Sequence, residues 1–357
     1  MSTAFYPLEI AQLRYETADT IVVTLQVPET LASTFAFAAG QHLTIKAMVD
    51  GQELRRNYSL CSSPLERKWS VAIKKVPGGL FSSFAHQHWR VGQVLEVMPP
   101  QGKFVLPPAP AHAPHYVGIA AGSGITPLIS IIKTTLASNP ASHFTLVYAN
   151  KNRGSIIFLE ALEALKNTYM QRFRLLHVLS RQSSSSALFN GRIDAEKCAA
   201  LFDGLVKEQS VQDWLVCGPQ GLTQTVTAYL SQAGVDRKRI HTELFGVAKA
   251  AVLPNNMPTA EGSIPSKVTI TQDGLTTAYS MVKSGQTILE QALAQGANLP
   301  FACKGGVCCT CKAKLLHGQV HMQVHYGLEQ DELDAGFVLT CQSQPLSQEV
   351  VLSFDAG

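Results

Sequence analysis

A chain of 357 residues predicts two or three domains of about 150 residues, each able to bury its own core. Its 29 basic and 26 acidic residues give a net charge of +3, which lacks the basic surplus that nucleic-acid binding needs, so we expect no nucleic-acid partner. No uninterrupted apolar run approaches the ~20 residues that span a bilayer, so we expect no membrane span. Because residues 1–10 do not resemble a signal peptide, we expect a cytoplasmic protein without a disulfide framework.

The first segment, residues 8–97, contains short runs rich in β-branched residues, separated by turn residues. Several short strands at this spacing predict a small antiparallel β-barrel. The clearest runs are residues 20–25, 42–45 and 69–73.

Two motifs in this segment suit a dinucleotide flavin. In Arg56-Asn57-Tyr58-Ser59, the arginine and the tyrosine share one face of a strand, so one can neutralise a phosphate while the other stacks on a flat ring. Gly78-Gly79-Leu80-Phe81-Ser82 predicts a helix that opens at Ser82, and a helix N-terminus can bind an anion. Either motif alone is compatible with ordinary structure, but together they describe a flavin whose pyrophosphate is held from two sides.

The second segment, residues 115–244, alternates buried-looking strands with helical stretches. This alternation predicts a doubly wound parallel sheet. The expected strands are residues 116–120, 144–148, 174–179 and 214–216, and the expected helices are residues 127–136, 156–166 and 222–232.

A nucleotide site is expected at the carboxyl edge of this sheet. Gly122 and Gly124 lie where the first strand delivers the chain to a helix N-terminus, which favours a pyrophosphate, although the same pattern also fits a purely structural turn. Cys217-Gly218-Pro219 follows a later strand at the same edge.

Ser180-Arg181 follows the third strand of this segment, where an adenosine ribose would lie. An arginine at this position can bind a 2′-phosphate through paired hydrogen bonds, which favours NADPH over NADH. The alternative is that Arg181 merely opens the polar loop of residues 183–186.

The third segment, residues 264–357, opens with an expected strand at 267–270 and a turn at Asp273-Gly274. A helix should start at the capping-box pair Thr287 and Glu290 and end at Gly296. Its apolar face would consist of Ile288, Leu289, Ala292 and Leu293.

Four cysteines near the C-terminus have the C-x4-C-x2-C spacing with one distant cysteine that is typical of plant-type ferredoxins, in which four thiolates hold a 2Fe-2S cluster. Zinc and chance spacing are the alternatives, but structural zinc sites usually contain C-x2-C pairs, whereas the first gap here is four residues. Cys309 lies between two ligand positions and should point away from them. The predicted ligands are Cys303, Cys308, Cys311 and Cys341.

Composition shifts divide the chain. A Pro/Ala connector occupies residues 107–114, and a stretch without periodicity occupies residues 248–262. We therefore predict a β-barrel domain at 1–108, an α/β domain at 109–247, a linker at 248–263 and an α+β domain of the β-grasp type at 264–357. The acidic run at 329–334 is expected to be a solvated helix face, with a docking patch for a basic partner as the alternative.

The ordered motifs resemble the ferredoxin-NADP reductase superfamily with a C-terminal 2Fe-2S module, over essentially the whole chain. Within it, several motifs are similar to the reductase subunits of bacterial phenylacetyl-CoA epoxidases, which supply a di-iron oxygenase acting on a ring-bearing CoA thioester. These motifs are Gln41-His42-Leu43-Thr44, Leu54-Arg55-Arg56-x-Tyr58-Ser59, Ala120 to Pro127, Gly191-Arg192-Ile193-Asp194 and Ala302 to Cys308.

The resemblance implies roles for individual residues. Ser59, Thr126 and Cys217 would be catalytic, with Ser59 beside the reactive nitrogen of the flavin and the other two flanking the nicotinamide. Arg56, Tyr58, Gly78, Gly79 and Ser82 would bind FAD, with Phe245 of the segment Glu243-Leu244-Phe245 near the flavin. Gly122, Gly124, Ser180, Arg181 and Gly218 would bind NADPH.

The resemblance also implies a direction of electron flow, from NADPH through FAD and the cluster to di-iron oxygenase subunits in a multicomponent complex. A nicotinamide gives two electrons as a hydride, whereas a 2Fe-2S cluster accepts one at a time, and a flavin can do both. The same architecture could instead serve a fatty-acyl desaturase, an alkane hydroxylase or a hybrid-cluster protein. A zinc-binding module without enzymatic activity is the remaining alternative.

Overall fold

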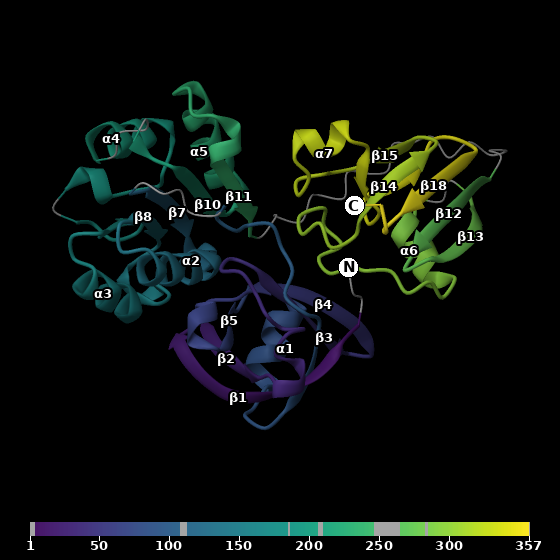
Figure 1. Cartoon of the computed structure of the whole chain (residues 1–357), viewed down its shortest axis with the longest axis horizontal. Coiled ribbons are helices and arrows are strands. Elements are labelled where there is room, and N and C mark those ends of the chain that lie inside the picture. The colour runs from purple at the N-terminus through teal and green to yellow at the C-terminus, as the bar shows by residue number, and fades with distance from the viewer. Residues whose placement is uncertain are drawn as a thin grey trace. The chain divides into compact units, whose positions relative to one another are not determined.

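The computed structural model describes residues 4–107, 113–184, 186–205, 210–245, 265–282 and 285–356 (Figure 1). The chain divides into two compact units, one holding nearly all of the barrel and the α/β sheet and the other holding the C-terminal sheet. The expected linker at 248–263 and residues 108–112 of the Pro/Ala connector lie outside the described residues.

The first sheet is a six-stranded antiparallel barrel with the strand order β4-β3-β6-β1-β2-β5. A bridge between Leu60 and Val71 joins the end of β4 to β5 and closes the barrel. Helix α1 (Leu80–His88) packs Phe81 and Ala85 into the barrel core. The strands are β1 (Tyr6–Thr17), β2 (Thr20–Gln26), β3 (His42–Val49), β4 (Gln52–Ser59), β5 (Trp69–Lys74) and β6 (Val94–Val97).

The second sheet has five parallel strands in the order β11-β10-β7-β8-β9. Helices α2 and α3 pack on one face and α4 and α5 on the other, as Figure 1 shows. The strands are β7 (His115–Ala121), β8 (His143–Asn150), β9 (Phe173–Leu179), β10 (Asp213–Gly218) and β11 (Ile240–Leu244), and the helices are α2 (Ile125–Ser138), α3 (Leu159–Thr168), α4 (Ala195–Leu205) and α5 (Gln220–Gln232).

The doubly wound prediction is confirmed, but all three expected helix starts were wrong, and α5 begins two residues before the expected position, at Gln220. Helix α2 begins before Pro127, because the first N–H groups of a helix have no intrahelical partner and proline therefore costs little there. Helix α3 begins at Leu159 and not at Ile156, because Phe158 has a left-handed backbone with φ 63°.

The third sheet has the order β13-β12-β18-β14-β16 and is mixed, since β12 pairs with β18 in parallel while the other pairs are antiparallel. Helix α6 (Ile288–Ala294) buries Ile288, Leu289 and Ala292 in its core, and the predicted capping box is confirmed. A sheet with one packed helix is the expected β-grasp arrangement. The remaining elements are β12 (Ser266–Gln272), β13 (Leu275–Met281), β14 (Lys312–His317), β15 (Val320–Met322), β16 (Phe337–Leu339), β17 (Ser343–Pro345), β18 (Glu349–Ser353) and α7 (Gln330–Asp334).

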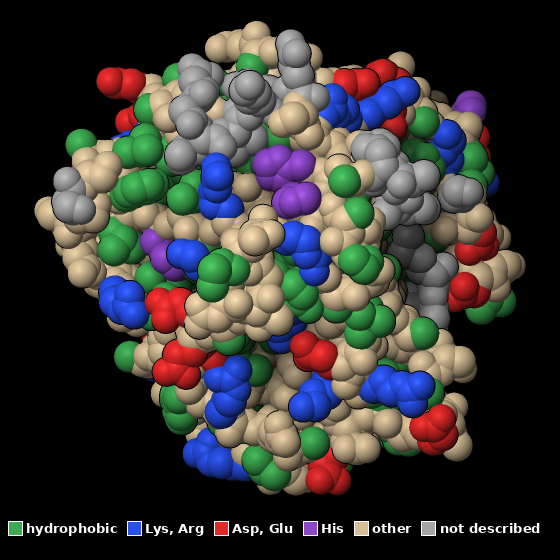
Figure 2. Space-filling view, turned by 60° about the vertical axis from the view of Figure 1, so that its left-hand side comes forward, with side chains coloured by type: hydrophobic (Ala, Val, Ile, Leu, Met, Phe, Trp, Pro, Cys, Tyr) green, Lys and Arg blue, Asp and Glu red, His purple; other side chains and the backbone are tan. Residues whose placement is uncertain are grey.

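The acidic run around α7 is only partly a solvated face, so that expectation was incomplete. Asp331 and Asp334 are exposed, but Glu332 forms an ion pair of 2.9 Å with Lys312, and both of these side chains are 11% exposed. Elsewhere, the face in Figure 2 carries basic side chains interspersed with acidic ones, in keeping with the small net charge of +3.

Candidate functional site

The four predicted cluster ligands gather in two pairs of thiols in the C-terminal unit. A hydrogen bond from the thiol of Cys308, followed by bonds from the backbone N–H groups of residues 305, 307 and 308, lowers the pKa of Cys303 to about 5. The thiol of Cys311 likewise lowers the pKa of Cys341. Within each pair the second thiol, Cys308 or Cys311, has a raised pKa because it donates its proton to the first. Iron is bound by thiolates, and one thiol of each pair is therefore ready to ionise while the other must lose its proton when iron binds.

Backbone N–H groups already point at these sulfurs. The N–H of Gly305 lies 3.3 Å from the Sγ of Cys303, and the N–H of Cys303 lies 3.5 Å from the Sγ of Cys308. The side-chain amide of Gln342 donates to the Sγ of Cys341 at 3.6 Å. Such hydrogen bonds to sulfur stabilise the reduced cluster and tune its potential.

The loop around the sulfurs needs two glycines, Gly306 inside the cysteine motif and Gly327 outside it. Gly306 has φ 73°, and a Cβ there would lie 2.7 Å from the side chain of Val324. At Gly327 a Cβ would lie 2.5 Å from the carbonyl oxygen of Val307, and its N–H donates to the Gly306 oxygen at 2.9 Å. Gly327 is far from the cysteine motif in sequence, so only the fold reveals its part in the loop.

The arrangement fits a binuclear cluster. In the described ranges no three His, Cys, Asp or Glu side chains are placed to hold a single metal ion, and a 2Fe-2S cluster does not need such a group because each iron takes two cysteines. Cys309 lies apart from these pairs: its thiol donates to the carbonyl of Gly327, and its side chain packs against the domain core.

In the barrel, the predicted flavin ligands lie on β4 and at the start of α1. The ring of Tyr58 lies 5.9 Å from that of Phe81, between centroids, and a guanidinium N–H of Arg56 donates to the carbonyl of Arg55 at 2.7 Å. Both Tyr58 and Arg56 keep part of their surface exposed, as residues that meet a ligand must.

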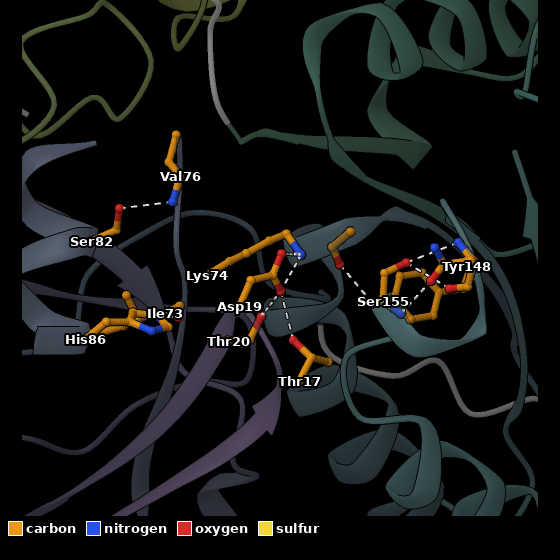
Figure 3. Close-up of polar contacts among 12 residues, drawn as sticks. Thr17, Asp19, Thr20, Ile73, Lys74, Val76, Ser82, His86, Tyr148 and Ser155 are labelled. Carbon is orange, nitrogen blue, oxygen red and sulfur yellow. Dashed lines mark hydrogen bonds and ion pairs between the residues drawn. The ribbon is translucent and has the colours of Figure 1, made fainter. Parts of the chain in front are cut away.

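The turn before α1 is held by Ser82. Its hydroxyl accepts a hydrogen bond from the N–H of Val76 at 3.1 Å, drawn in Figure 3, and donates to the carbonyl of Gly79 at 3.4 Å. Gly78 has φ 70°, with open space where a Cβ would lie. The hydroxyl of Ser82 is therefore engaged within the turn, and the free N–H groups of the first turn of α1 are the donors available to a phosphate.

The nucleotide loop joins β7 to α2. Gly122 has φ 54° and open space on its Cβ side, whereas a Cβ on Gly124 would lie 2.1 Å from the carbonyl oxygen of Cys217. Gly124 is thus required for the close approach of the loop to β10, a role like that of the last glycine in dinucleotide-binding folds. Thr126 is 2% exposed, and its hydroxyl donates to the carbonyl of Ser123 at 3.0 Å.

Ser180 and Arg181 lie at a different part of this sheet edge. Their backbone N–H groups donate to the carbonyls of Asn150 and Lys151, at 2.9 and 2.8 Å, and this pairing continues the β8–β9 ladder. Both side chains keep solvent-accessible surface, and the cationic one is therefore accessible to an anion in solvent.

The structure brings Ser59 and Cys217 together around a residue that the site prediction omitted, Glu243. The hydroxyl of Ser59 donates to the Oε2 of Glu243 at 3.3 Å, and the thiol of Cys217 lies 3.9 Å from the same oxygen. Next to this cluster, the N–H of Phe245 donates to the carbonyl of Gly218 at 2.9 Å. Glu243 pairs with Cys217 in the parallel β10–β11 ladder, and the segment Glu243-Leu244-Phe245 was the sequence signal that could have identified it.

Burial dominates the electrostatics of this cluster. Glu243 keeps some solvent exposure, yet the surrounding protein raises the pKa of its carboxyl to about 8, against the opposing hydrogen bonds from Ser59 and Cys217. Burial, followed by the nearby Glu243 charge, raises the pKa of Cys217 well above its usual range. A carboxyl that titrates near neutral pH can hold or release a proton at the site, while Cys217 stays a neutral thiol.

Three protein families match successive parts of the chain. The families are "Oxidoreductase FAD-binding domain" over residues 7–106, "Oxidoreductase NAD-binding domain" over residues 119–228 and "2Fe-2S iron-sulfur cluster binding domain" over residues 270–346. The first covers the barrel, the second the parallel sheet and the third the cysteine loop. No helix in the described part of the chain is long and apolar enough to cross a membrane.

Similarity to characterised proteins extends over the full length. The chain is 44% identical over 354 residues to a subunit of the 1,2-phenylacetyl-CoA epoxidase of Escherichia coli (strain K12), covering 99% of each chain. It is 31% identical to the ferredoxin reductase component of 3-ketosteroid-9-alpha-monooxygenase of Rhodococcus rhodochrous, covering 97% of this chain and 96% of that one. Among solved structures, phthalate dioxygenase reductase superposes with a TM-score of 0.62 at 25% identity, covering 98% of each chain.

The three domains and the sites within them define an electron-transfer oxidoreductase. The chain belongs to the family of oxygenase reductases that join FAD-binding, NAD-binding and 2Fe-2S domains in one polypeptide, within the ferredoxin-NADP reductase superfamily. The expected fold class and the expected cofactor classes are therefore confirmed, and its homologues are reductase components of multicomponent oxygenases.

Proposed function

We propose that this protein is the NADPH-dependent reductase of a phenylacetyl-CoA 1,2-epoxidase in phenylacetate degradation, and that its electron acceptor is a di-iron oxygenase. The observation that carries the proposal is the 44% identity to the subunit of the Escherichia coli epoxidase, which extends over 99% of both chains. The match includes the C-terminal domain, from which electrons leave for the partner.

Each domain supplies the residues for one step of the proposed electron transfer. In the barrel, Arg56 and Tyr58 of β4 with the turn at Gly78, Gly79 and Ser82 would hold FAD, which accepts a hydride and releases single electrons. Ser59, Thr126 and Cys217 would position the reacting rings, with Phe245 beside them. In the C-terminal domain, Cys303, Cys308, Cys311 and Cys341 would bind the cluster as thiolates.

NADPH is the proposed donor. Gly122 leaves open space at the carboxyl edge of the sheet, while Gly124 and Gly218 allow the backbone to pack closely there. Ser180 and Arg181 are accessible at the end of β9. An exposed arginine can form paired hydrogen bonds with a 2′-phosphate that NADH lacks.

We further propose the domain boundaries 1–108, 109–247 and 264–357 with a linker at 248–263, because each family match lies inside one of these ranges. A cytoplasmic location is proposed because all eight cysteines are free thiols and the reaction draws on a cellular nicotinamide pool.

A second candidate acceptor is the oxygenase component of a steroid-type monooxygenase. The observation that favours it is the 31% identity, over 97% of this chain, to a reductase of 3-ketosteroid-9-alpha-monooxygenase. No feature of the chain favours a fatty-acyl desaturase, an alkane hydroxylase or a hybrid-cluster protein over these two acceptors.

Reconstitution tests the proposal. In one reaction the purified holoprotein and NADPH are combined with the oxygenase subunits of a phenylacetyl-CoA epoxidase and phenylacetyl-CoA. In a second reaction they are combined with a 3-ketosteroid oxygenase and its own substrate. NADPH oxidation coupled to product formation is measured in both. We expect coupled turnover with the epoxidase subunits. Coupled turnover only with the steroid oxygenase would overturn the assignment of the acceptor.

A further inference from the structure

Asn150 is a buried polar residue at the edge of the nucleotide-binding sheet, and it has no role in the site described above. It is the last residue of β8 and is 8% exposed, yet its side-chain nitrogen Nδ2 has no hydrogen-bond partner among the described residues. A buried N–H donor without an acceptor destabilises a folded protein, and native structures keep few of them. An amide kept in this state suggests that its acceptor is a ligand.

The position of Asn150 points to which ligand. Ala149 pairs with Ala121 in the parallel β7–β8 ladder, so Asn150 lies one residue further along, level with Gly122 at the start of the nucleotide loop. Ligands of doubly wound folds bind at this carboxyl edge, with the pyrophosphate at the loop that enters the first helix. Gly122 has φ 54° and open space on its Cβ side.

Tyr148 joins strand β8 to the nucleotide loop through a hydrogen bond. Its hydroxyl donates to the carbonyl of Gly122 at 2.8 Å and approaches the carbonyl of Ile157 at 3.4 Å, while the residue is 0% exposed. Tyr148 and Ser155, both labelled in Figure 3, lie on either side of the turn that follows β8. Tyr148 and Asn150 are two residues apart in a strand and so share one face of the sheet.

Burial raises the pKa of Tyr148, and the nearby amide of Asn150 opposes that rise, although the two side chains make no hydrogen bond of good geometry. The hydroxyl is already committed to the Gly122 carbonyl. This bond uses the proton of the hydroxyl and not its lone pairs, so a ligand is inferred only because Nδ2 has no acceptor of good geometry among the described residues.

We propose that Asn150 binds the nicotinamide nucleotide by donating from its side-chain amide to the pyrophosphate, and that Tyr148 is a positioning residue that fixes the Gly122 peptide of the same subsite. Both assignments rest on the proposed function only in requiring a nicotinamide dinucleotide as donor. Because NADH and NADPH share the pyrophosphate, this subsite contributes equally to both and does not select between them.

The Asn150→Leu variant separates a ligand role from a structural one. Leucine has a similar size but no donor, so the thermal midpoint of the free holoprotein should stay the same or rise. The Kd for NAD+ and for NADP+, measured by calorimetric titration of the holoprotein, should rise at least about 10-fold for each. The matched control is Thr227→Val on α5, which also removes a buried hydroxyl without a partner and should leave both Kd values unchanged.

The Tyr148→Phe variant tests the positioning role by the same titration, with an expected rise of about 5-fold in both Kd values, the size of one neutral hydrogen bond. Its control is Tyr279→Phe, which removes a hydroxyl that donates to the backbone carbonyl of Ile288 in the other unit. That variant should lose stability without any change in nucleotide affinity.

Unchanged nucleotide affinity in Asn150→Leu would overturn the proposal and leave the amide with a buried water as its partner. A loss confined to NADP+ would also overturn it, since the contact would then lie on the 2′-phosphate. Wild-type protein that binds neither nucleotide would overturn this proposal and the proposed function together, whereas normal wild-type binding with unaffected variants would overturn this proposal alone.

Discussion

The thiol of Cys217 lies 3.9 Å from the Oε2 of Glu243, its register partner on the neighbouring parallel strand. The same oxygen accepts the hydroxyl of Ser59, which comes from the end of β4 in the barrel. One carboxyl thus joins the flavin-binding and nucleotide-binding halves of the larger unit, at the place where a hydride would pass between them.

Replacing Glu243 should change how stability depends on pH. Burial raises the pKa of Glu243 from 4.5 to about 8, so the folded protein holds this proton more tightly than the unfolded chain does. The resulting stabilisation is complete below the unfolded pKa and is lost as the pH rises through about 8.

In Glu243→Gln this contribution disappears, so the free energy of unfolding should fall less steeply between about pH 5 and 8 than in the wild type. Urea unfolding at several pH values across that range measures the two slopes. Parallel pH profiles for the two proteins would mean that Glu243 titrates in the folded state as it does in the unfolded chain.

Removal of a cluster ligand should abolish most of the iron-sulfur absorption of the protein and leave the flavin absorption. In Cys311→Ser the cluster loses one of four thiolates, so the iron content and the visible 2Fe-2S absorption should fall by most of their wild-type values while FAD remains bound. Cys309→Ser is the matched control, because that thiol donates to the Gly327 carbonyl. Equal loss of iron in both variants would contradict the ligand assignment.

The two glycines of the nucleotide loop should respond differently to alanine. Gly124→Ala places a Cβ 2.1 Å from the Cys217 carbonyl oxygen and should lower the free energy of unfolding by about 3 kcal/mol or more, the upper end of overpacking costs. Gly122→Ala meets no neighbouring atom and should cost only the left-handed backbone, about 1–2 kcal/mol. Urea unfolding measures both, and equal losses would show that the loop does not approach β10 so closely.

Arg181→Ala should reduce the preference for NADPH. Loss of a charge-assisted bond to the 2′-phosphate should raise the Kd for NADPH about 10-fold or more and leave that for NADH nearly unchanged. Arg192→Ala, also an exposed arginine of this domain, is the control. If both nucleotides weaken equally in Arg181→Ala, the residue contacts a group that they share.

Much of the fold was predictable because each domain has a strong local signature. The hydrophobic runs at residues 144–148 and 214–216 and the capping box of Thr287 and Glu290 all lie where expected. The start of α3 could not be predicted, because Phe158 adopts a left-handed backbone that is uncommon for a bulky residue. The N–H of Phe158 donates to the carboxylate of Glu16, which lies more than a hundred residues away in the chain.

The site prediction names residues that are close in sequence and omits residues that only the fold brings together. The spacing of the cysteines predicts that they lie close together, and the N–H of Cys303 lies 3.5 Å from the Sγ of Cys308. Glu243 and Gly327 were missed, because a strand pairing in one case and a loop contact in the other place them next to residues far away in the chain.

The central claim is that electrons pass from a nicotinamide through the flavin to the cluster within this chain. Stopped-flow absorbance of the holoprotein mixed with NADPH, and separately with NADH, tests it most directly. We predict bleaching of the flavin band followed by loss of the iron-sulfur bands, faster with NADPH. A protein that purifies colourless with bound zinc, or a flavin that bleaches while the iron-sulfur bands stay oxidised, would contradict the account.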